Sequence, residues 1–176
     1  MNRSSILVAA LLCAMGSASM AQGTATSAES SASAKEFIEK AGTSGLAEVE
    51  MGELGARKAK NSQVEAFAKR MVADHTKANQ ELITASKGKG GQVPSSRTDT
   101  HKAAVERFQQ QDAGKNFDRD YMHHMVEDHE AAVELFETAA DDEKLDLELR
   151  GYAKKTLPIL RDHLKQAQSI QSKLAD

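Results

Sequence analysis

The fold is decided by the stretch NFDRDYMHHMVEDHEAAVELF, which covers residues 116–136. Asn116 is a residue type that commonly caps a helix, and apolar residues follow it at steps of three and four, the spacing of one helix face. These apolar positions are Phe117, Tyr121, Met125, Ala132 and Phe136. Asp128 and His129 lie within this stripe, where an aliphatic residue is expected. The stretch therefore predicts a core helix that carries polar side chains.

Other parts of the chain have the same helical spacing. Long amphipathic segments cover residues 46–60, 64–85 and 145–174, and a shorter one covers residues 96–111. Alternating runs of β-branched residues are absent, and Ala, Glu, Lys and Leu dominate. The sequence predicts an all-α fold, namely a ferritin-like antiparallel four-helix bundle with a short extra helix in the crossover between helices 2 and 3.

The chain of 176 residues has the length of one domain preceded by a targeting segment. Arg3, an apolar run and small residues up to Ala21 predict a secretory signal peptide over residues 1–21. Residues 22–33 are rich in Ser, Ala and Thr and predict a disordered leader. The bundle domain then covers residues 34–176, with an interruption of its first helix expected at the Gly-Thr-Ser-Gly of residues 42–45.

Composition excludes several classes of function. The only cysteine, Cys13, lies in the predicted signal peptide, so the mature chain has no disulfide and no thiolate ligand. The net charge of −3 comes from interspersed charges without a basic patch, which argues against nucleic-acid binding. No apolar run in the mature chain is long enough for a transmembrane helix. We expect a soluble periplasmic protein. Peripheral association with the envelope and the oligomeric state stay open.

Three histidines each follow an aspartate, on three different predicted helices. The pairs are Asp74-His75, Asp128-His129 and Asp162-His163. Neighbouring side chains on a helix point about 100° apart. If each histidine points inward, its aspartate lies at the edge of the core and can reach a histidine of the adjacent helix.

The functional interpretation is a metal site inside the bundle. Imidazole and carboxylate together suit iron, zinc, manganese or copper, and a carboxylate that holds the second ring nitrogen fixes the imidazole. Methionines at a similar level would favour copper if they pointed inward; these are Met71, Met122 and Met125. The predicted ligands or their hydrogen-bonding partners are His75, His129, His163, Glu48, Asp74, Asp128 and Asp162.

Two alternatives stay open. The Asp-His pairs could be buried hydrogen-bonded clasps in a structural or interaction module without turnover. A di-metal oxidoreductase is the third interpretation, but such bundles use Glu-x-x-His on two helices. The nearest match here is Asp120-x-x-His123 on a single helix. His123 and His124 are adjacent and cannot both point inward.

The chain resembles a family of secreted ferritin-like bacterial proteins that is catalogued as a domain of unknown function. The resemblance covers about residues 35–173. It is carried by GLAEVEMG at 45–52, FAKRMVADH at 67–75, Phe117-Asp118 with Tyr121 and Met125, Asp128-His129, and Leu157-Pro158 with Leu160, His163 and Leu164. The resemblance implies a ferritin-like fold and export, with members labelled as outer-membrane or periplasmic proteins. It implies no activity, and likeness to ferritin is no evidence for iron.

Overall fold

The computed structural model describes residues 21–174, with side chains described from residue 29 onward. This part of the chain holds five α-helices and no strand, which confirms the predicted all-α class. The helices are α1 (Ala21–Lys58), α2 (Ser62–Ala85), α3 (Asp99–Gln110), α4 (Lys115–Asp141) and α5 (Leu147–Leu174). The predicted signal peptide falls on residues outside this description, apart from Ala21.

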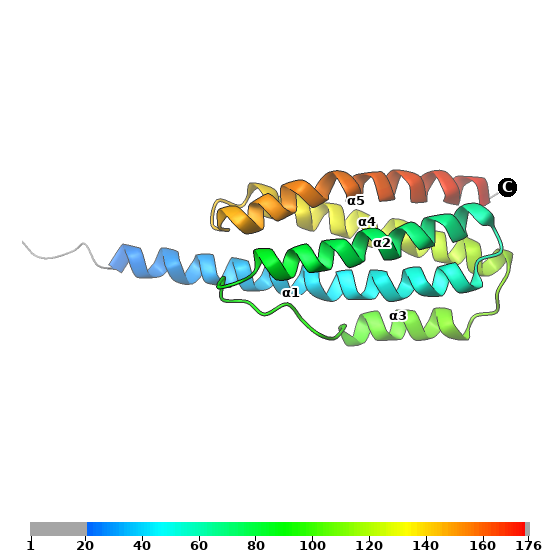
Figure 1. Ribbon diagram of the computed structural model, residues 1–176, viewed down its shortest axis with the longest axis horizontal. Coiled ribbons are helices and arrows are strands. Elements are labelled where there is room, and N and C mark those ends of the chain that lie inside the picture. Colours follow the sequence, from blue (N-terminus) through cyan, green and yellow to red (C-terminus); the bar gives the residue numbers. More distant parts are fainter. Residues whose placement is uncertain (1–20, 175–176) are drawn as a thin grey trace, which may run out of the picture.

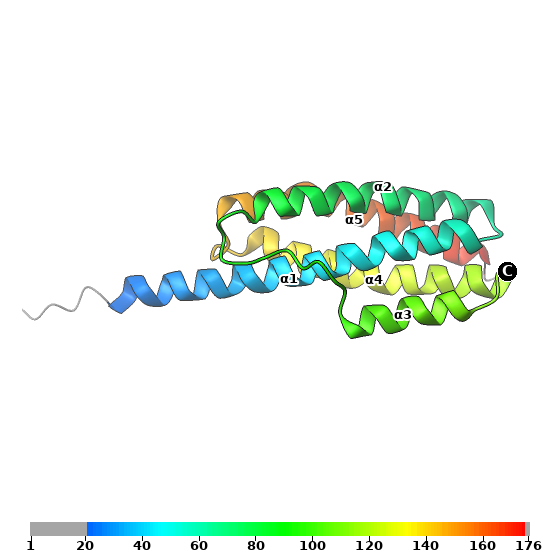
Figure 2. The ribbon, with the colours of Figure 1, turned by 60° about the horizontal axis from the view of Figure 1, so that its bottom comes forward.

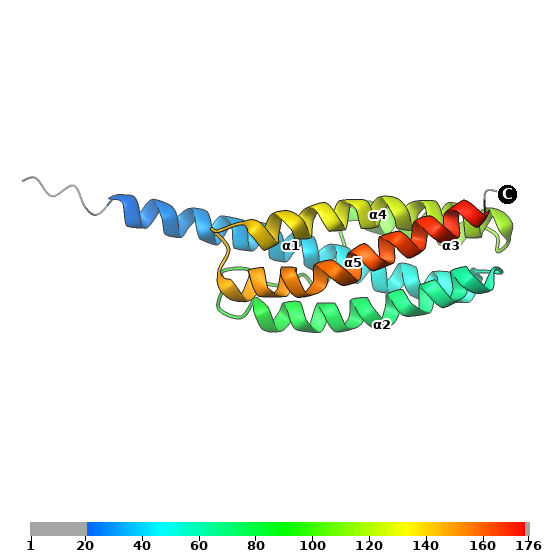
Figure 3. The ribbon, with the colours of Figure 1, turned by 90° about the horizontal axis from the view of Figure 1, so that it is seen from above.

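The four long helices α1, α2, α4 and α5 lie side by side, and α1 extends beyond the others at one end (Figure 1). The most extensive packing joins α1 to α2 and α4 to α5, and α2 also packs on α5. After α2 the chain returns along the bundle through α3, so α2 and α4 run in the same direction (Figures 1 and 3). α3 lies on the outside, along one half of the bundle, next to α1 and α4 (Figure 2).

The N-terminal part of α1 corrects two expectations. Residues 22–33, predicted as a disordered leader, form the beginning of α1, whose Ser30 hydroxyl donates to the carbonyl oxygen of Lys144 at 2.6 Å. The glycines of residues 42–45 do not interrupt the helix either. A Cβ at Gly42 would lie 2.7 Å from Cδ of Pro94, so this glycine serves the close approach of another segment rather than a helix break.

The beginning of α4 differs from the predicted cap at Asn116. The residue before the helix is Gly114, whose φ of 146° is accessible to glycine, and it makes no side-chain capping hydrogen bond. One turn later, Asp118 is buried and its carboxylate accepts hydrogen bonds from the backbone N–H groups of Lys60 and Asn61. The acidic residue of this first turn therefore holds the connection between α1 and α2.

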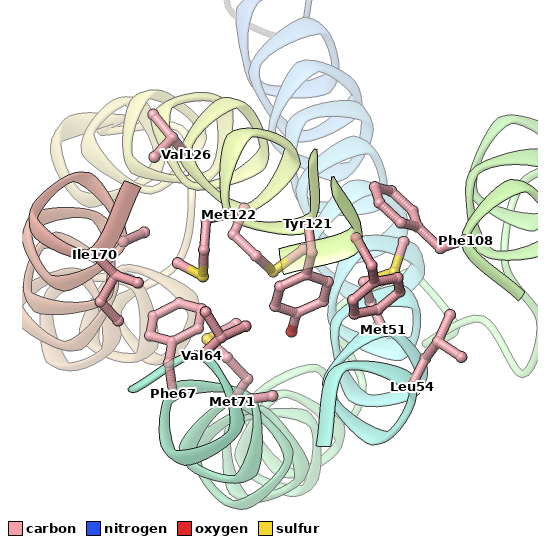
Figure 4. Close-up of a cluster of buried hydrophobic side chains, with 14 of the residues drawn as sticks. Met51, Leu54, Val64, Phe67, Met71, Phe108, Tyr121, Met122, Val126 and Ile170 are labelled. Carbon is pink, nitrogen blue, oxygen red and sulfur yellow. The ribbon is translucent and has the colours of Figure 1, made fainter. Parts of the chain in front are cut away.

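The core consists of two apolar clusters placed one after the other along the bundle. Figure 4 shows the cluster nearer the C-terminus, in which Phe67 and Met71 of α2, Met122 and Tyr121 of α4 and Ile170 of α5 point inward. The second cluster is built around Phe37, Phe136, Leu149, Tyr152 and Leu160. On α2, α4 and α5 a histidine lies between the residues of one cluster and those of the other.

Candidate metal centre

Three imidazoles meet in the interior at the level between the two apolar clusters. His75 comes from α2, His129 from α4 and His163 from α5, and they are 7%, 0% and 1% exposed. The ring centroids are 5.4–5.7 Å apart, and one ring nitrogen of each lies within 4.8 Å of the others. The geometric expectation that these three histidines point inward and converge is therefore confirmed.

For two of these rings, the hydrogen bonds show which nitrogen carries the proton and which keeps a lone pair. Nδ1 of His129 lies 2.8 Å from the carbonyl oxygen of Met125, which can only accept, so Nδ1 carries the proton. Nε2 of His163 lies 2.8 Å from a carboxylate oxygen of Asp74 and donates to it. A lone pair is left on Nε2 of His129 and on Nδ1 of His163. Both atoms, like Nε2 of His75, are buried without a hydrogen-bond partner.

A short chain of charged groups holds Asp74 in place. Nε of Arg70 donates to Asp74 at 3.1 Å, and its Nη1 donates to Asp162 at 2.6 Å and to Gln166 at 3.2 Å. Arg70 lies four residues before Asp74 on α2, so the two face the same side of the helix. The arginine thus joins α2 to α5 beside the histidine cluster and orients the carboxylate that binds His163.

The environment favours neutral imidazoles. Burial, followed by the nearby His129 and His163, holds the pKa of His75 well below its ordinary value. Burial, with a further contribution from His163, lowers the pKa of His129 to about 4. Burial also lowers the pKa of His163, although its hydrogen bond to Asp74 opposes the shift. Neutral rings with free lone pairs are the form in which histidine ligates a metal.

Two of the predicted aspartates lie away from the cluster. Asp162 has a side chain that is 56% exposed, and it binds Arg70 instead of a histidine. The carboxylate of Asp128 lies 3.2 Å from Nε2 of His124, a histidine of the same helix. Burial raises the pKa of Asp128 to about 6. Only Asp74 makes the predicted contact with a histidine of another helix.

Glu48 lies on α1, the one long helix that contributes no histidine. It is buried, with one carboxylate oxygen unpaired, and burial followed by the charge of Asp128 raises its pKa well above the ordinary value. The α1 glycines on either side of it face α2, Gly45 at Asn79 and Gly52 at Val72, which places Glu48 at the level of His75. Its oxygens do not belong to the set of atoms within 4.8 Å of one another.

The walls of the centre are aromatic and apolar. Phe67 packs edge-on against His129 and His163, with ring centroids 6.4 and 6.3 Å apart. Met71 and Met122 lie in the apolar cluster that continues from there (Figure 4). The surroundings exclude other polar groups from these faces of the rings.

The comparison with known proteins gives a family. The model of DUF4142, described as a domain of unknown function, matches residues 19–170. The chain belongs to this family. Neither the search of curated proteins nor that of solved structures found a match. The family description assigns no activity to this DUF4142 chain.

Some features of the site were missing from the sequence prediction. Arg70 precedes Asp74 by four residues, and this spacing was a readable signal for their ion pair. The carbonyl of Met125 carries no signal in the sequence, because every residue has such a group.

Within residues 21–174, no helix is both long enough and apolar enough to cross a bilayer.

Proposed function

We propose that the protein is an exported, periplasmic ferritin-like four-helix bundle that binds one transition-metal ion through His75, His129 and His163. Its role would lie in metal handling or in the response of the cell envelope to stress. The observation that carries this proposal is that three buried imidazoles offer ring nitrogens within 4.8 Å of one another, and that each of the three rings has a buried nitrogen without a hydrogen-bond partner. Leaving a buried polar atom without a partner costs about 1–3 kcal/mol, and one bound cation would satisfy all three.

The chemistry of the donors supports iron, copper or zinc. Imidazole nitrogen suits these ions, whereas magnesium and calcium prefer oxygen ligands. Asp74 would act as the outer partner that fixes the ring of His163 and strengthens its donor nitrogen. Glu48 lies at the same level, so its carboxylate would balance the charge of a divalent ion or reach it after a change of rotamer. Asp128 and Asp162 are not needed as ligands.

The order of the helices supports the ferritin-like assignment. Four long helices lie side by side, and the connection through α3 makes α2 and α4 parallel (Figures 1 and 3). Bundles with one long crossover are typical of ferritin-like folds, in which metal ligands project inward from facing helices.

A structural role without metal, in which an Asp-His hydrogen bond acts as a clasp between helices, is the second candidate because one observation favours it. The hydrogen bond between Asp74 and His163 joins α2 to α5 whether or not a metal is bound. A clasp alone leaves three buried nitrogens unused, however, which is why we rank it second. A di-metal oxidoreductase has less support, since the described residues bring together ligand atoms for a single ion.

Metal analysis of protein purified without a His-tag tests the proposal. We expect about one ion per chain by inductively coupled plasma mass spectrometry, and loss of it in a His75→Ala, His129→Ala double variant. The matched control is His123→Ala, because His123 is an exposed histidine of α4. Circular dichroism would show that each variant is folded. Stoichiometric metal in the double variant would refute the ligand assignment.

Chelation separates the metal site from the clasp. An ion that binds only the folded state adds about 2.7 kcal/mol of stability at one hundred times its dissociation constant. Chelator should therefore lower the melting temperature of the protein but leave that of the double variant unchanged. A melting temperature of the metal-loaded protein that is indifferent to chelator would support the clasp.

Export is tested separately. Mass spectrometry of the protein from a periplasmic fraction should give a mature chain that begins at Gln22. A full-length chain in the cytoplasm would contradict this part of the proposal and leave the metal site untouched.

A further inference from the structure

A groove runs along the outside of the bundle between α1 and α4, and none of the three clustered histidines lines it. Its volume is about 760 Å³, within the range of pockets for small molecules. Apolar side chains form its floor, and these are Phe37, Ala131, Ala132, Leu135, Ala139 and Leu145. At one end Thr98 and His101 at the beginning of α3 meet Asp128 of α4.

The groove exists because α3 covers only half of the seam between α1 and α4 (Figure 2). In the covered half, Val105 and Phe108 of α3 are buried, and the ring of Phe108 packs on His124 and Tyr121. In the other half the alanines of α4 are too small to fill the space. The groove is therefore closed at the α3 end and open to solvent along its side.

The unpaired charged side chains along the groove are acidic. Sequence positions 120–143 contain no Lys or Arg, whereas acidic residues recur on every turn of the second half of α4. Lys40 is the one Lys or Arg residue of the lining, and it pairs with Glu36 at 2.7 Å. Among the described residues no Lys or Arg side chain forms an ion pair with Asp128, Glu134 or Asp142.

We propose that this groove binds a small organic cation with a chain-like apolar body. The ammonium group lies at the closed end, against the carboxylate of Asp128 and near His101, whose Nδ1 is buried without a partner. The apolar chain lies on the alanines of α4 and on Phe37, and Glu134 adds negative potential at the rim. Carboxylic acids of the same length are repelled by these carboxylates.

The closed end favours a small molecule over a helix as occupant. A helix that continued the path of α3 would meet Thr98 and His101, which already close the groove. A second copy of this chain would have to place a basic face over Glu134 and Asp142.

Isothermal titration calorimetry with decylammonium, below its micellar concentration, tests the proposal. Decanoate is the matched probe of opposite charge, and butylammonium is the probe of the same charge with a much shorter apolar chain. We expect both to bind at least about tenfold more weakly than decylammonium, a difference of about 1.4 kcal/mol. Raising the salt concentration to about 0.5 M should weaken decylammonium binding, because partly exposed charges are screened.

Matched variants locate the binding. Ala131→Trp fills the groove from an exposed position of α4 and should abolish decylammonium binding, whereas Ala66→Trp on the exposed face of α2 should leave it unchanged. Glu134→Gln should weaken binding about two- to fivefold and Glu106→Gln on α3 should not. Metal content should stay the same in all four variants, which separates this proposal from the metal site.

Several results would overturn the assignment. Equal binding of decanoate, or equal effects of the two tryptophan variants, would show that the amine binds elsewhere or without specificity. If the protein is a dimer in sedimentation experiments and Ala131→Trp converts it to a monomer, the groove is the binding site for a second copy of the chain. If a Leu/Lys amphipathic peptide displaces decylammonium and binds with much higher affinity, the groove is the binding site for a basic helix.

Discussion

Removal of the Asp74 carboxylate is the sharpest test of the metal centre. In Asp74→Ala, Nε2 of His163 loses the acceptor that lies 2.8 Å away, while the histidine itself is only 1% exposed. The ring then has no fixed tautomer, and the proton can move to Nδ1, the nitrogen that the metal needs. The substitution therefore acts on both the stability of the metal-free protein and the affinity for the ion.

The two magnitudes follow from different principles. A buried N–H group left without a partner costs about 1–3 kcal/mol, which we expect as the loss in free energy of unfolding of the metal-free protein. Loss of the outer partner of a metal-bound histidine costs about 10–100-fold in affinity. This second effect corresponds to about 1.4–2.7 kcal/mol.

Urea denaturation of chelator-treated protein measures the first quantity, and competition with a chromophoric chelator for Zn²⁺ or Co²⁺ measures the second. Asp162→Ala is the matched control, because Asp162 binds the other arm of the same Arg70 but touches no histidine. Its side chain is largely exposed, and exposed ion pairs contribute about 0–1 kcal/mol. We expect its effect on metal affinity to stay within about threefold.

A role for Asp74 in metal binding is refuted if Asp74→Ala lowers the stability of the metal-free protein but leaves the metal affinity within about threefold of the original. Asp74 would then be a clasp between α2 and α5 and nothing more. Equal losses of affinity in the Asp74 and Asp162 variants would instead make the effect a general one of charge near the site.

Three further predictions concern acid, packing and α3. The pKa of His129 is lowered to about 4 by burial, against about 6.5 in the unfolded chain, so protonation favours unfolding as the pH falls from about 6.5 to 4. In metal-free His129→Gln we expect the acid-induced loss in free energy of unfolding to be about 3 kcal/mol smaller than in the original protein. Urea denaturation of both proteins at several pH values measures this difference. An equal dependence on pH in the two proteins would contradict a buried neutral ring at His129. Gly55→Ala would place a Cβ 2.6 Å from Cζ of Tyr121 and should cost about 1–3 kcal/mol in thermal or urea unfolding, whereas Gly151→Ala, with nothing within 4 Å, should gain about 0.5–1 kcal/mol. The Lys58 ammonium donates to backbone carbonyls at the end of α3, so Lys58→Met should speed amide hydrogen exchange in residues 99–110, and unchanged exchange there would show that other contacts hold α3.

Periodicity predicted the fold well because most of the stability of a helix in a folded protein comes from packing its apolar face against the core. The stripe of α4 predicted from Phe117, Tyr121 and Phe136 is buried in the structure. Prediction failed at residues 22–33 and 42–45, where composition suggested disorder and a break. Glycine in a helix costs only about 1 kcal/mol, and at Gly42 the close packing of Pro94 explains why a larger residue is absent.

The three Asp-His pairs show where sequence reasoning about the site ends. Helix geometry sets the angle between adjacent side chains, so an inward histidine sends its aspartate to one flank of the helix. Which neighbour occupies that flank depends on the packing of the whole bundle. At Asp74 the flank faces α5 and His163, at Asp162 it faces solvent and Arg70, and at Asp128 it faces the groove beside α1. One dipeptide pattern thus places a carboxylate beside the histidine cluster, on the surface and in the groove between α1 and α4, and only the packing of the helices distinguishes the three.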